Sequence, residues 1–227
     1  MPNQYIAIVP AAGIGSRMQA TIAKQYLKLG SKTVIEHSLS QLLTYPKLAE
    51  VVVALHPEDN QFSSLEIASH PKLHAVTGGD ERVDSVLAAL KACPPDATAL
   101  VHDAARPCLR HTDIDALIAK LETSAQAAIL ARPATDTIKS AHGSTIAKTL
   151  PREHIWGAQT PQASGVATLI NAIEQAMTNT TLTDEASALE FCGIPVELVA
   201  GSSDNIKITH PEDLALAEFY LQQQGRL

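Results

Sequence analysis

The sequence reads Pro10-Ala11-Ala12-Gly13-Ile14-Gly15-Ser16-Arg17-Met18 directly after the apolar run Tyr5–Val9. A short apolar run that ends in a glycine-rich turn predicts a buried strand, followed by a loop whose backbone N–H groups can approach phosphates closely. Arg17 lies in this loop and Lys24 follows it. Two cations beside a glycine-rich turn favour a triphosphate-binding loop, while two solvated surface cations are the simpler alternative.

Two familiar glycine motifs do not fit this loop. A dinucleotide-binding fingerprint requires Gly or Ala where Met18 stands, and an acidic residue at the end of the second strand. A P-loop requires Gly-Lys-Ser/Thr without interruption, whereas the chain reads Gly30-Ser31-Lys32-Thr33. The loop therefore indicates phosphate binding of another kind.

Strand-like and helix-like segments alternate outward from this loop. The helix pattern is clearest where Val83, Val86, Leu87 and Leu90 recur with helical spacing behind Asp80, a possible N-cap. Such alternation predicts an α/β, Rossmann-like fold in which helices flank a mostly parallel sheet. The predicted strands are Tyr5–Val9, Glu50–Leu55, Lys72–Thr77, Ala99–Val101 and Ala127–Ala131, and the predicted helices are Val34–Leu43, Glu58–Glu66, Arg82–Lys91 and Thr112–Thr123.

The pattern changes between residues 135 and 155. Two short polar, alternating runs, residues 136–139 and 145–148, predict a β-hairpin with little apolar surface of its own. A loose surface loop and a dimerisation arm are equally compatible with this pattern. Helices are then predicted at residues 165–179, 184–191 and 210–223, with a strand at 196–200, and Thr209 and Glu212 have capping-box spacing for the last helix. We expect one domain over residues 1–227 with an arm at about 135–155.

The composition limits the classes of partner. The 227 residues include 17 Lys and Arg against 24 Asp and Glu, which gives a net charge of −7. An acidic chain is a poor candidate for general binding to nucleic acid or an anionic membrane, so a basic pocket would have to be local. The three cysteines form no paired motif, and no apolar stretch is long enough to span a bilayer. A cytoplasmic location is the expectation.

Further polar segments follow the predicted strands. In Gly78–Ser85, Gly79, Asp80 and Ser85 could contact a base or a sugar, although a simple capped turn explains the same residues. Asp103 in the segment His102–Pro107 suits a hard cation such as Mg²⁺ carrying nucleotide phosphates, with a structural ion pair to the nearby arginine as an equal alternative.

Three other segments are expected near the same edge of the sheet. They are Thr135-Asp136-Thr137, Gln159–Gln162, and Thr183–Ser187, in which Thr183 is best explained as an N-cap. Lys207 stands among apolar residues, where an unpaired ammonium is unfavourable, so a buried anionic partner is expected. No zinc spacing and no hydrolase nucleophile motif is present.

These segments, taken in order, resemble the 2-C-methyl-D-erythritol 4-phosphate cytidylyltransferase family. The resemblance rests on Pro10–Met18, residues 24–27, Gly78–Ser85, His102–Pro107, residues 136–139, Gln159–Gln162, residues 183–190 and residues 205–213. It implies a homodimeric nucleotidyltransferase whose hairpin arm interlocks with the partner. It also implies a reaction of CTP with methylerythritol phosphate that releases pyrophosphate in the presence of Mg²⁺, which the CTP phosphates would mainly hold. Such chemistry depends on positioning and charge neutralisation.

The resemblance also implies roles for individual residues. The catalytic residues would be Arg17, Lys24, Arg152 and Lys207. The nucleotide would contact Ala11, Ala12, Gly13, Gly15, Gly79, Asp80, Ser85 and Ala104. The second substrate would contact Asp103, Arg106, Thr137, Thr160, Thr183 and Lys207, with Arg152 reaching across from the partner subunit, and Asp103 is the candidate metal ligand.

One residue departs from the family's usual pattern, and two other functions stay open. Ala23 stands before Lys24 where the family usually has proline, which predicts a more mobile loop without ligand. The same scaffold could serve a ribitol-5-phosphate cytidylyltransferase. It could also serve a non-catalytic nucleotide-sensing subunit, but such a subunit would be expected to lack Arg17 or Lys24.

Overall fold

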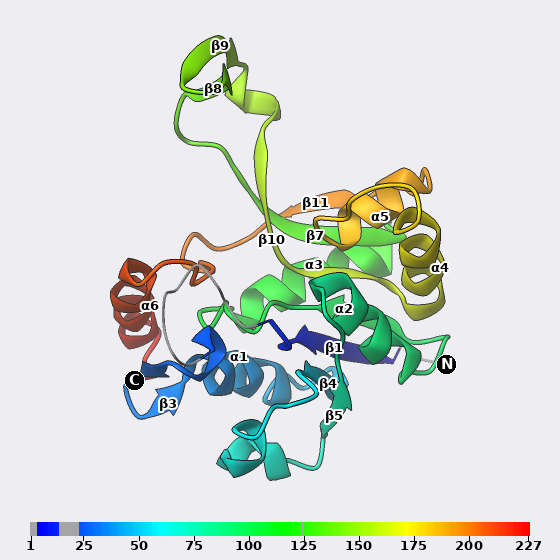
Figure 1. The fold of residues 1–227 in the computed structure, drawn as a ribbon, viewed down its shortest axis with the longest axis vertical. Coiled ribbons are helices and arrows are strands. Elements are labelled where there is room, and N and C mark those ends of the chain that lie inside the picture. Colours follow the sequence, from blue (N-terminus) through cyan, green and yellow to red (C-terminus); the bar gives the residue numbers. More distant parts are fainter. Residues whose placement is uncertain (1–3, 14–22, 124) are drawn as a thin grey trace.

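Seven strands form one twisted sheet in the computed structural model, which describes residues 4–13, 23–123 and 125–227. They are β1 (Tyr5–Pro10), β4 (Leu48–Leu55), β5 (Leu73–Thr77), β6 (Thr98–Val101), β7 (Ala127–Pro133), β10 (Trp156–Gly165) and β11 (Glu197–Ala200). The strand order is β11-β7-β10-β6-β1-β4-β5 (Figure 1). Only β10 runs antiparallel to its two neighbours within this sheet. The predicted α/β fold with a mostly parallel sheet is confirmed.

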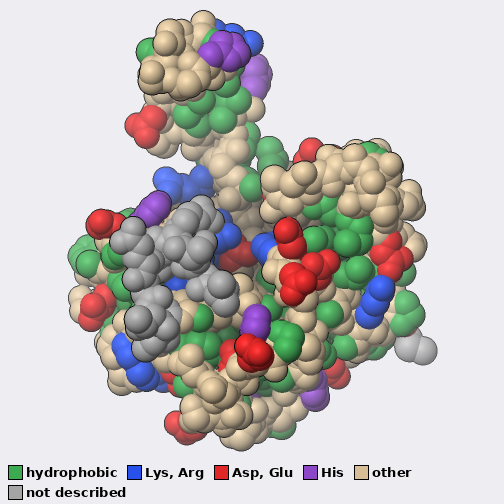
Figure 2. Space-filling model, viewed as in Figure 1, with side chains coloured by type: hydrophobic (Ala, Val, Ile, Leu, Met, Phe, Trp, Pro, Cys, Tyr) green, Lys and Arg blue, Asp and Glu red, His purple; other side chains and the backbone are tan. Residues whose placement is uncertain are grey.

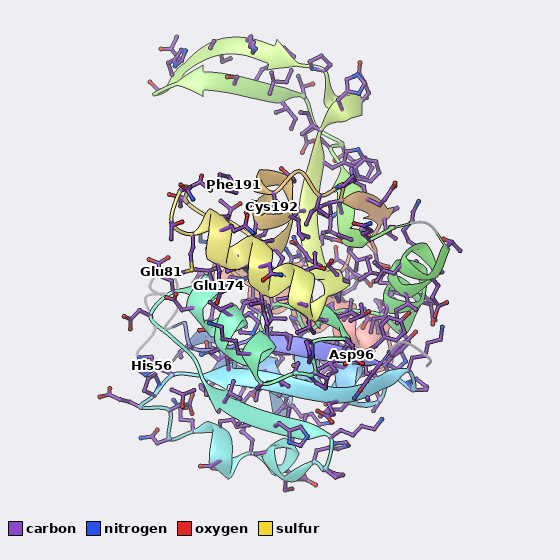
Figure 3. The ribbon with its side chains drawn as sticks, turned by 90° about the vertical axis from the view of Figure 1, so that its right-hand side faces the viewer. His56, Glu81, Asp96, Glu174, Phe191 and Cys192 are labelled. Atoms are coloured by element: carbon purple, nitrogen blue, oxygen red, sulfur yellow. The ribbon has the colours of Figure 1, made fainter. Side chains whose placement is uncertain are left out.

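Helices cover both faces of the sheet, as the continuous apolar strands require. On one face α1 (Val34–Leu43) and α3 (His111–Thr123) pack against the odd-numbered β1 residues, among them Ala7 and Val9. On the other face α2 (Arg82–Lys91), α4 (Val166–Ala176) and α5 (Glu185–Phe191) pack against Ile6 and Ile8. Figure 3 shows α2 and α4 together over this second face. Because successive side chains of a strand point to opposite faces, β1 lies in the middle of two cores.

The last helix, α6 (Glu212–Gln223), belongs to a third, smaller apolar cluster. Its buried members are Leu29, Val34, Cys108, Ile208, Ala217 and Leu221. Leu29 lies in a small ribbon formed by β2 (Lys28–Leu29) and β3 (Lys32–Thr33). This cluster therefore brings the end of the chain against the start of α1 and against the segment that carries Lys207.

The predicted cap of α6 is wrong, because the side chain that accepts hydrogen bonds at the helix start is Asp213 and not Glu212. The backbone N–H groups of Thr209 and His210 both donate to Asp213 Oδ2, each at 2.8 Å. Asp213 therefore stabilises the helix start, and the expected Thr209–Glu212 capping box does not form.

The hairpin arm is confirmed as a hairpin. It consists of β8 (Ile138–His142) and β9 (Thr145–Leu150), with Gly143 at φ +58° in the turn and a short 3₁₀ helix, η5 (Arg152–His154), behind it. Figures 1 and 3 both show it standing away from the body of the subunit. Its side chains are largely exposed, including Ile146 at 61% exposure.

One predicted helix, Glu58–Glu66, is wrong. Two short 3₁₀ helices, η3 (Phe62–Ser64) and η4 (Glu66–Ser69), occupy this region. Asp59 Oδ1 accepts hydrogen bonds from the backbone N–H groups of Gln61 at 3.0 Å and Phe62 at 2.9 Å. A side chain that binds nearby backbone in this way competes with the regular helical hydrogen bonds.

Strand β10 is the strand of the main sheet that the sequence analysis missed. Its polar residues Gln159, Thr160, Gln162 and Ser164 are all buried between β6 and β7. Gln162, for example, donates from Nε2 to Asp184 Oδ2 at 2.9 Å and accepts from the Ala186 N–H at 2.9 Å. Side-chain hydrogen bonds of this kind make buried polar residues tolerable in the centre of a sheet.

No helix in the described part of the chain is long and apolar enough to cross a membrane.

Candidate functional site

The predicted site segments meet at one edge of the sheet. Parallel strands end at the same edge, and the loops after β1, β5, β6 and β11 all begin there. The antiparallel β10 adds Thr160 to this edge, because its Gln162 is the partner of Val101, the last residue of β6. Figure 2 shows Lys and Arg side chains around the base of the arm on the same side of the molecule.

Asp103 is the centre of the site, and three cations surround it. Lys207 Nζ lies 2.9 Å from Oδ2, Arg106 Nε lies 3.5 Å from Oδ2, and Arg82 Nε lies 3.1 Å from Oδ1. Burial alone would raise the pKa of Asp103, but the charges of these three cations outweigh it and hold the pKa well below its ordinary value. Asp103 is therefore a permanent carboxylate. The anionic partner expected for Lys207 and the Asp103–Arg106 pair are both present.

A chain of hydrogen bonds fixes the backbone beside this carboxylate. The Asp103 N–H donates to Thr160 Oγ1 at 3.0 Å, and Thr160 Oγ1 lies 3.0 Å from His102 Nδ1. His102 Nε2 lies 3.1 Å from the Arg106 carbonyl oxygen, which can only accept, so we assign the ring proton to Nε2. Thr160 then donates its hydroxyl proton to Nδ1. Burial lowers the pKa of His102 to about 4, which keeps this ring neutral at neutral pH.

The Arg106 guanidinium is held from the opposite side. Its NH1 group donates to the Asn205 carbonyl at 2.8 Å, and NH2 donates to the Ala158 carbonyl at 3.4 Å. Asn205 in turn donates from Nδ2 to the Thr160 carbonyl at 2.8 Å. The loop after β6, strand β10 and the segment before α6 thus share one buried hydrogen-bond network.

Lys24 lies next to the segment that carries Lys207. It stands in a short 3₁₀ helix, η2 (Lys24–Tyr26), and its Nζ donates to the Ile208 carbonyl at 3.2 Å. The N–H of Ile208 donates to the Ala105 carbonyl at 2.9 Å. The structure therefore brings Lys24, Lys207 and the loop of Asp103 together.

The residue before Lys24 has a backbone conformation that proline also adopts. Ala23 has φ −57°, which lies inside the range that the proline ring permits. Alanine here therefore preserves the path of the chain, while the greater mobility of the loop stays a prediction.

The turn after β5 is shaped by Ser85. Its Oγ accepts from the Gly79 N–H at 3.2 Å and is buried against Gly78, where an added Cβ would lie 2.7 Å from Oγ and 2.9 Å from Ala12 Cβ. This close approach explains glycine at position 78. Asp80 is exposed, and the expected Asp80 cap is wrong: the N-cap of α2 is Glu81, whose N–H donates to Asp84 Oδ2.

The start of the nucleotide loop is also described. Ala11 and Ala12 are buried, and Gln25 Nε2 donates to the carbonyls of Ala11 at 2.7 Å and Gly13 at 3.1 Å. Ala104, also buried, accepts at its carbonyl from Ser38 Oγ at 2.7 Å. Gly15 and Arg17 lie outside the described residues.

Three of the residues predicted for the second substrate do not join the cluster around Asp103. Thr137 and Arg152 lie at the base of the arm and are exposed, and Arg152 NH1 donates to the Thr135 carbonyl at 2.7 Å. Thr183 is exposed as well, and it is not the N-cap of α5, since Asp184 Oδ1 accepts from the Ser187 N–H at 3.0 Å.

Two residues of the cluster were missed by the sequence analysis. Arg82 contacts Asp103, and it also makes a bidentate pair with Glu185, at 2.6 and 3.0 Å. Both lie inside quoted segments, Gly78–Ser85 and Thr183–Ser187, but no local pattern in the sequence links two residues that are 103 positions apart.

The surroundings of Asp103 do not suit a role as a metal ligand. Each of its oxygens already contacts a cationic side chain, so an added divalent ion would meet three positive charges. Elsewhere in the described ranges no group of three His, Cys, Asp or Glu residues could hold a metal ion.

Comparisons with known proteins agree on one family. The family model described as IspD, 2-C-methyl-D-erythritol 4-phosphate cytidylyltransferase, matches residues 5–223. A curated protein of that description from Shewanella sediminis is 53% identical over 221 residues, covering 96% of this chain and 94% of its own. Its counterpart from Escherichia coli O139:H28 is 51% identical over 218 residues, covering 95% of this chain and 92% of its own.

Two solved structures have the same fold. The Francisella tularensis 2-C-methyl-D-erythritol 4-phosphate cytidylyltransferase superposes with a TM-score of 0.83 at 37% identity, covering 96% of this chain and all of that one. A crystal structure of 4-diphosphocytidyl-2C-methyl-D-erythritol synthase gives a TM-score of 0.84 at 32% identity, covering 97% and 99%.

The neutral, buried His102 leads to a prediction on pH. Its pKa is about 4 in the folded protein against an ordinary value of 6.5, so between these pH values the unfolded chain binds a proton that the native protein does not. The stabilisation from His102 is therefore complete above pH 6.5 and is lost as the pH falls toward 4. Between pH 7 and pH 5 this loss amounts to about 2 kcal/mol.

Urea denaturation of the wild type and of His102→Gln at both pH values measures this contribution. The fall in unfolding free energy from pH 7 to pH 5 should be smaller in the variant by about 2 kcal/mol. The unfolding free energy of His142→Gln, a change on the exposed arm, should fall by the same amount as that of the wild type. An equal fall in all three proteins would contradict the assigned neutral ring.

Proposed function

Because the chain belongs to the 2-C-methyl-D-erythritol 4-phosphate cytidylyltransferase family, we propose that the cluster around Asp103 is where it joins its two substrates. The substrates are CTP and 2-C-methyl-D-erythritol 4-phosphate, and the products are 4-diphosphocytidyl-2-C-methyl-D-erythritol and pyrophosphate. The observation that carries this placement is the group of three cations on one buried carboxylate at the carboxyl edge of the sheet. Open α/β sheets bind their ligands at that edge.

The charges of the cluster suit a phosphorylated polyol. The three cations Arg82, Arg106 and Lys207 exceed the two acids Asp103 and Glu185, and Lys24 lies beside them. An excess of positive charge attracts the phosphate, and a permanent carboxylate can accept hydrogen bonds from hydroxyl groups. We assign Asp103, Arg106, Thr160 and Lys207 to this substrate, with Thr183 at the margin.

The nucleotide lies, in this proposal, across the neighbouring turns. Ala11, Ala12, Gly13 and Gly15 would approach it from the first loop, and Gly79, Asp80, Ser85 and Ala104 would line the cytosine and ribose. The close packing of Gly78 against Ser85 and Ala12 supports this placement, because it holds the turn after β5 next to the loop after β1.

The chemistry is a direct displacement at phosphorus. A phosphate oxygen of the methylerythritol phosphate attacks the α-phosphorus of CTP, a new P–O bond forms, and the bond to the departing pyrophosphate breaks. This step needs no protein nucleophile, so the protein contributes alignment and neutralisation of the developing charge. Lys24, Arg17 and Lys207 are the proposed cations for this purpose, joined by Arg152 of a second subunit.

Magnesium is part of the proposal, but no described residue is assigned as its ligand. Asp103 does not fit this role, so the ion would be carried by the CTP phosphates, and it would neutralise part of their charge.

The arm is the basis for a proposed homodimer. A two-stranded hairpin is marginally stable alone, and this one exposes Ile146 and, at its base, Trp156. We propose that it lies on a second copy of the chain, where Arg152 and Thr137 would complete the partner's site. Residues 1–227 would then act as one domain, with the arm at about 135–155 as its dimerisation element.

Substrate preference tests the proposed function. Pyrophosphate release from CTP should require methylerythritol phosphate, and kcat/KM for this alcohol should exceed that for ribitol 5-phosphate by at least about a hundredfold, since a site built for one polyol leaves polar groups unpaired with another. A coupled pyrophosphate assay measures both.

Two results would contradict this function. A higher kcat/KM for ribitol 5-phosphate would favour the ribitol enzyme, and no turnover of either alcohol despite CTP binding would favour a nucleotide-sensing subunit.

The arm exchange has its own test. Lys24→Ala and Arg152→Ala should each lower kcat by about a hundredfold or more, which is roughly 2.7 kcal/mol of transition-state stabilisation. If Arg152 acts across the dimer, mixing the two variants creates heterodimers with one intact site, so part of the activity should return. The exposed Lys47→Ala, between α1 and β4 and outside the arm, is the control and should keep wild-type activity. Heterodimers confirmed by native mass spectrometry without recovered activity would rule out the exchange.

A further inference from the structure

Arg82 joins three elements of the site. It is the first residue of α2, directly behind the turn assigned to the nucleotide. Its Nε donates to Asp103 Oδ1 at 3.1 Å, in the loop after β6. Its NH1 and NH2 groups donate to the two oxygens of Glu185, the first residue of α5, at 2.6 and 3.0 Å. All three nitrogens of one guanidinium are thereby engaged by two carboxylates.

Both carboxylates are buried, which makes this arrangement specific. The side chains of Glu185 and Asp103 are 3% and 9% exposed, against 30% for Arg82. A buried carboxylate is costly unless it is paired, so Glu185 holds the guanidinium in one orientation. Glu185 is itself fixed, because Gln162 binds the residues on either side of it, Asp184 and Ala186.

The contact with Arg82 decides how Asp103 faces the other two cations. With Oδ1 engaged by Arg82, only Oδ2 points to Lys207 and Arg106. Without Arg82, the carboxylate could rotate and offer both oxygens to these two cations, and their charge would then be less available to a substrate. The orientation of Asp103 thus depends on Glu185, which it does not touch directly.

We propose that Arg82 and Glu185 are a positioning pair that orients Asp103 for the phosphorylated alcohol. The inference rests on the proposed placement of that alcohol at Asp103. Neither residue needs to touch the alcohol itself: Glu185 acts through Arg82, and Arg82 acts through Asp103.

A second ion pair on α2 provides the matched control. Lys91, the last residue of α2, pairs with Glu174 of α4 at 2.7 Å, and both side chains are about half exposed. Glu174, labelled in Figure 3, pairs with the last residue of α2, whereas Arg82 is the first residue of that helix. Glu174→Gln therefore removes an ion pair between α2 and a neighbouring helix, as Glu185→Gln does, without affecting Asp103.

The experiment compares steady-state kinetics and thermal unfolding of wild type, Glu185→Gln and Glu174→Gln. Glu185→Gln keeps the shape of the side chain but weakens the bidentate pair. We expect its KM for methylerythritol phosphate to rise about tenfold, in line with the loss of one charged hydrogen bond. Its KM for CTP should stay within twofold, and Glu174→Gln should match the wild type in both constants. A purely structural pair would lower the melting temperature without separating the two KM values.

If Glu185→Gln folds poorly, Arg82→Lys provides a second test. Lysine keeps a charge for Glu185 but cannot bridge both carboxylates, so the same separation of KM values is expected. Both constants unchanged, or both raised equally, in the folded variants would overturn the proposal.

Asp103→Asn separates this inference from the proposed function. If it leaves the KM for the alcohol unchanged, the placement of the substrate is wrong. If it raises that KM while Glu185→Gln and Arg82→Lys do not, the placement stands and the positioning pair is wrong.

Discussion

The carboxylate of Asp103 keeps three cationic side chains together in a site that would otherwise be strongly repulsive. Arg82, Arg106 and Lys207 come from α2, the loop after β6 and the segment before α6, and each lies within 3.5 Å of one of its oxygens. Their charges in turn keep Asp103 ionised. The surrounding hydrogen bonds through Thr160 and His102 hold the backbone at this position.

The acidic composition and the basic site are compatible because charge is distributed unevenly. A chain with net charge −7 concentrates cations at one edge of its sheet, where we propose that the two anionic substrates of the family's reaction meet. The third apolar cluster supports this concentration, since the buried Ile208 follows Lys207 and accepts the hydrogen bond of Lys24. Packing of α6 therefore contributes to the position of two catalytic candidates.

Local patterns predicted most of the fold, and contacts between distant segments account for the errors. The helices at Val34–Leu43 and Arg82–Lys91 have the predicted bounds, because amphipathic spacing is a local property. Strand β10 escaped prediction, because its buried Gln162 is hydrogen-bonded to Asp184 and Ala186 at the start of α5, which are distant in the sequence. In the site, an anion for Lys207 was predictable from its apolar surroundings. The bridge from Arg82 to Glu185 was not, since only folding brings them together.

A crystal structure with methylerythritol phosphate and a non-hydrolysable CTP analogue tests the central claim most directly. The account predicts alcohol hydroxyls within hydrogen-bond distance of Asp103, phosphate oxygens near Arg106 and Lys207, and Arg82 still bridging Asp103 and Glu185. An alcohol bound elsewhere, with the cluster around Asp103 free of substrate, would contradict it.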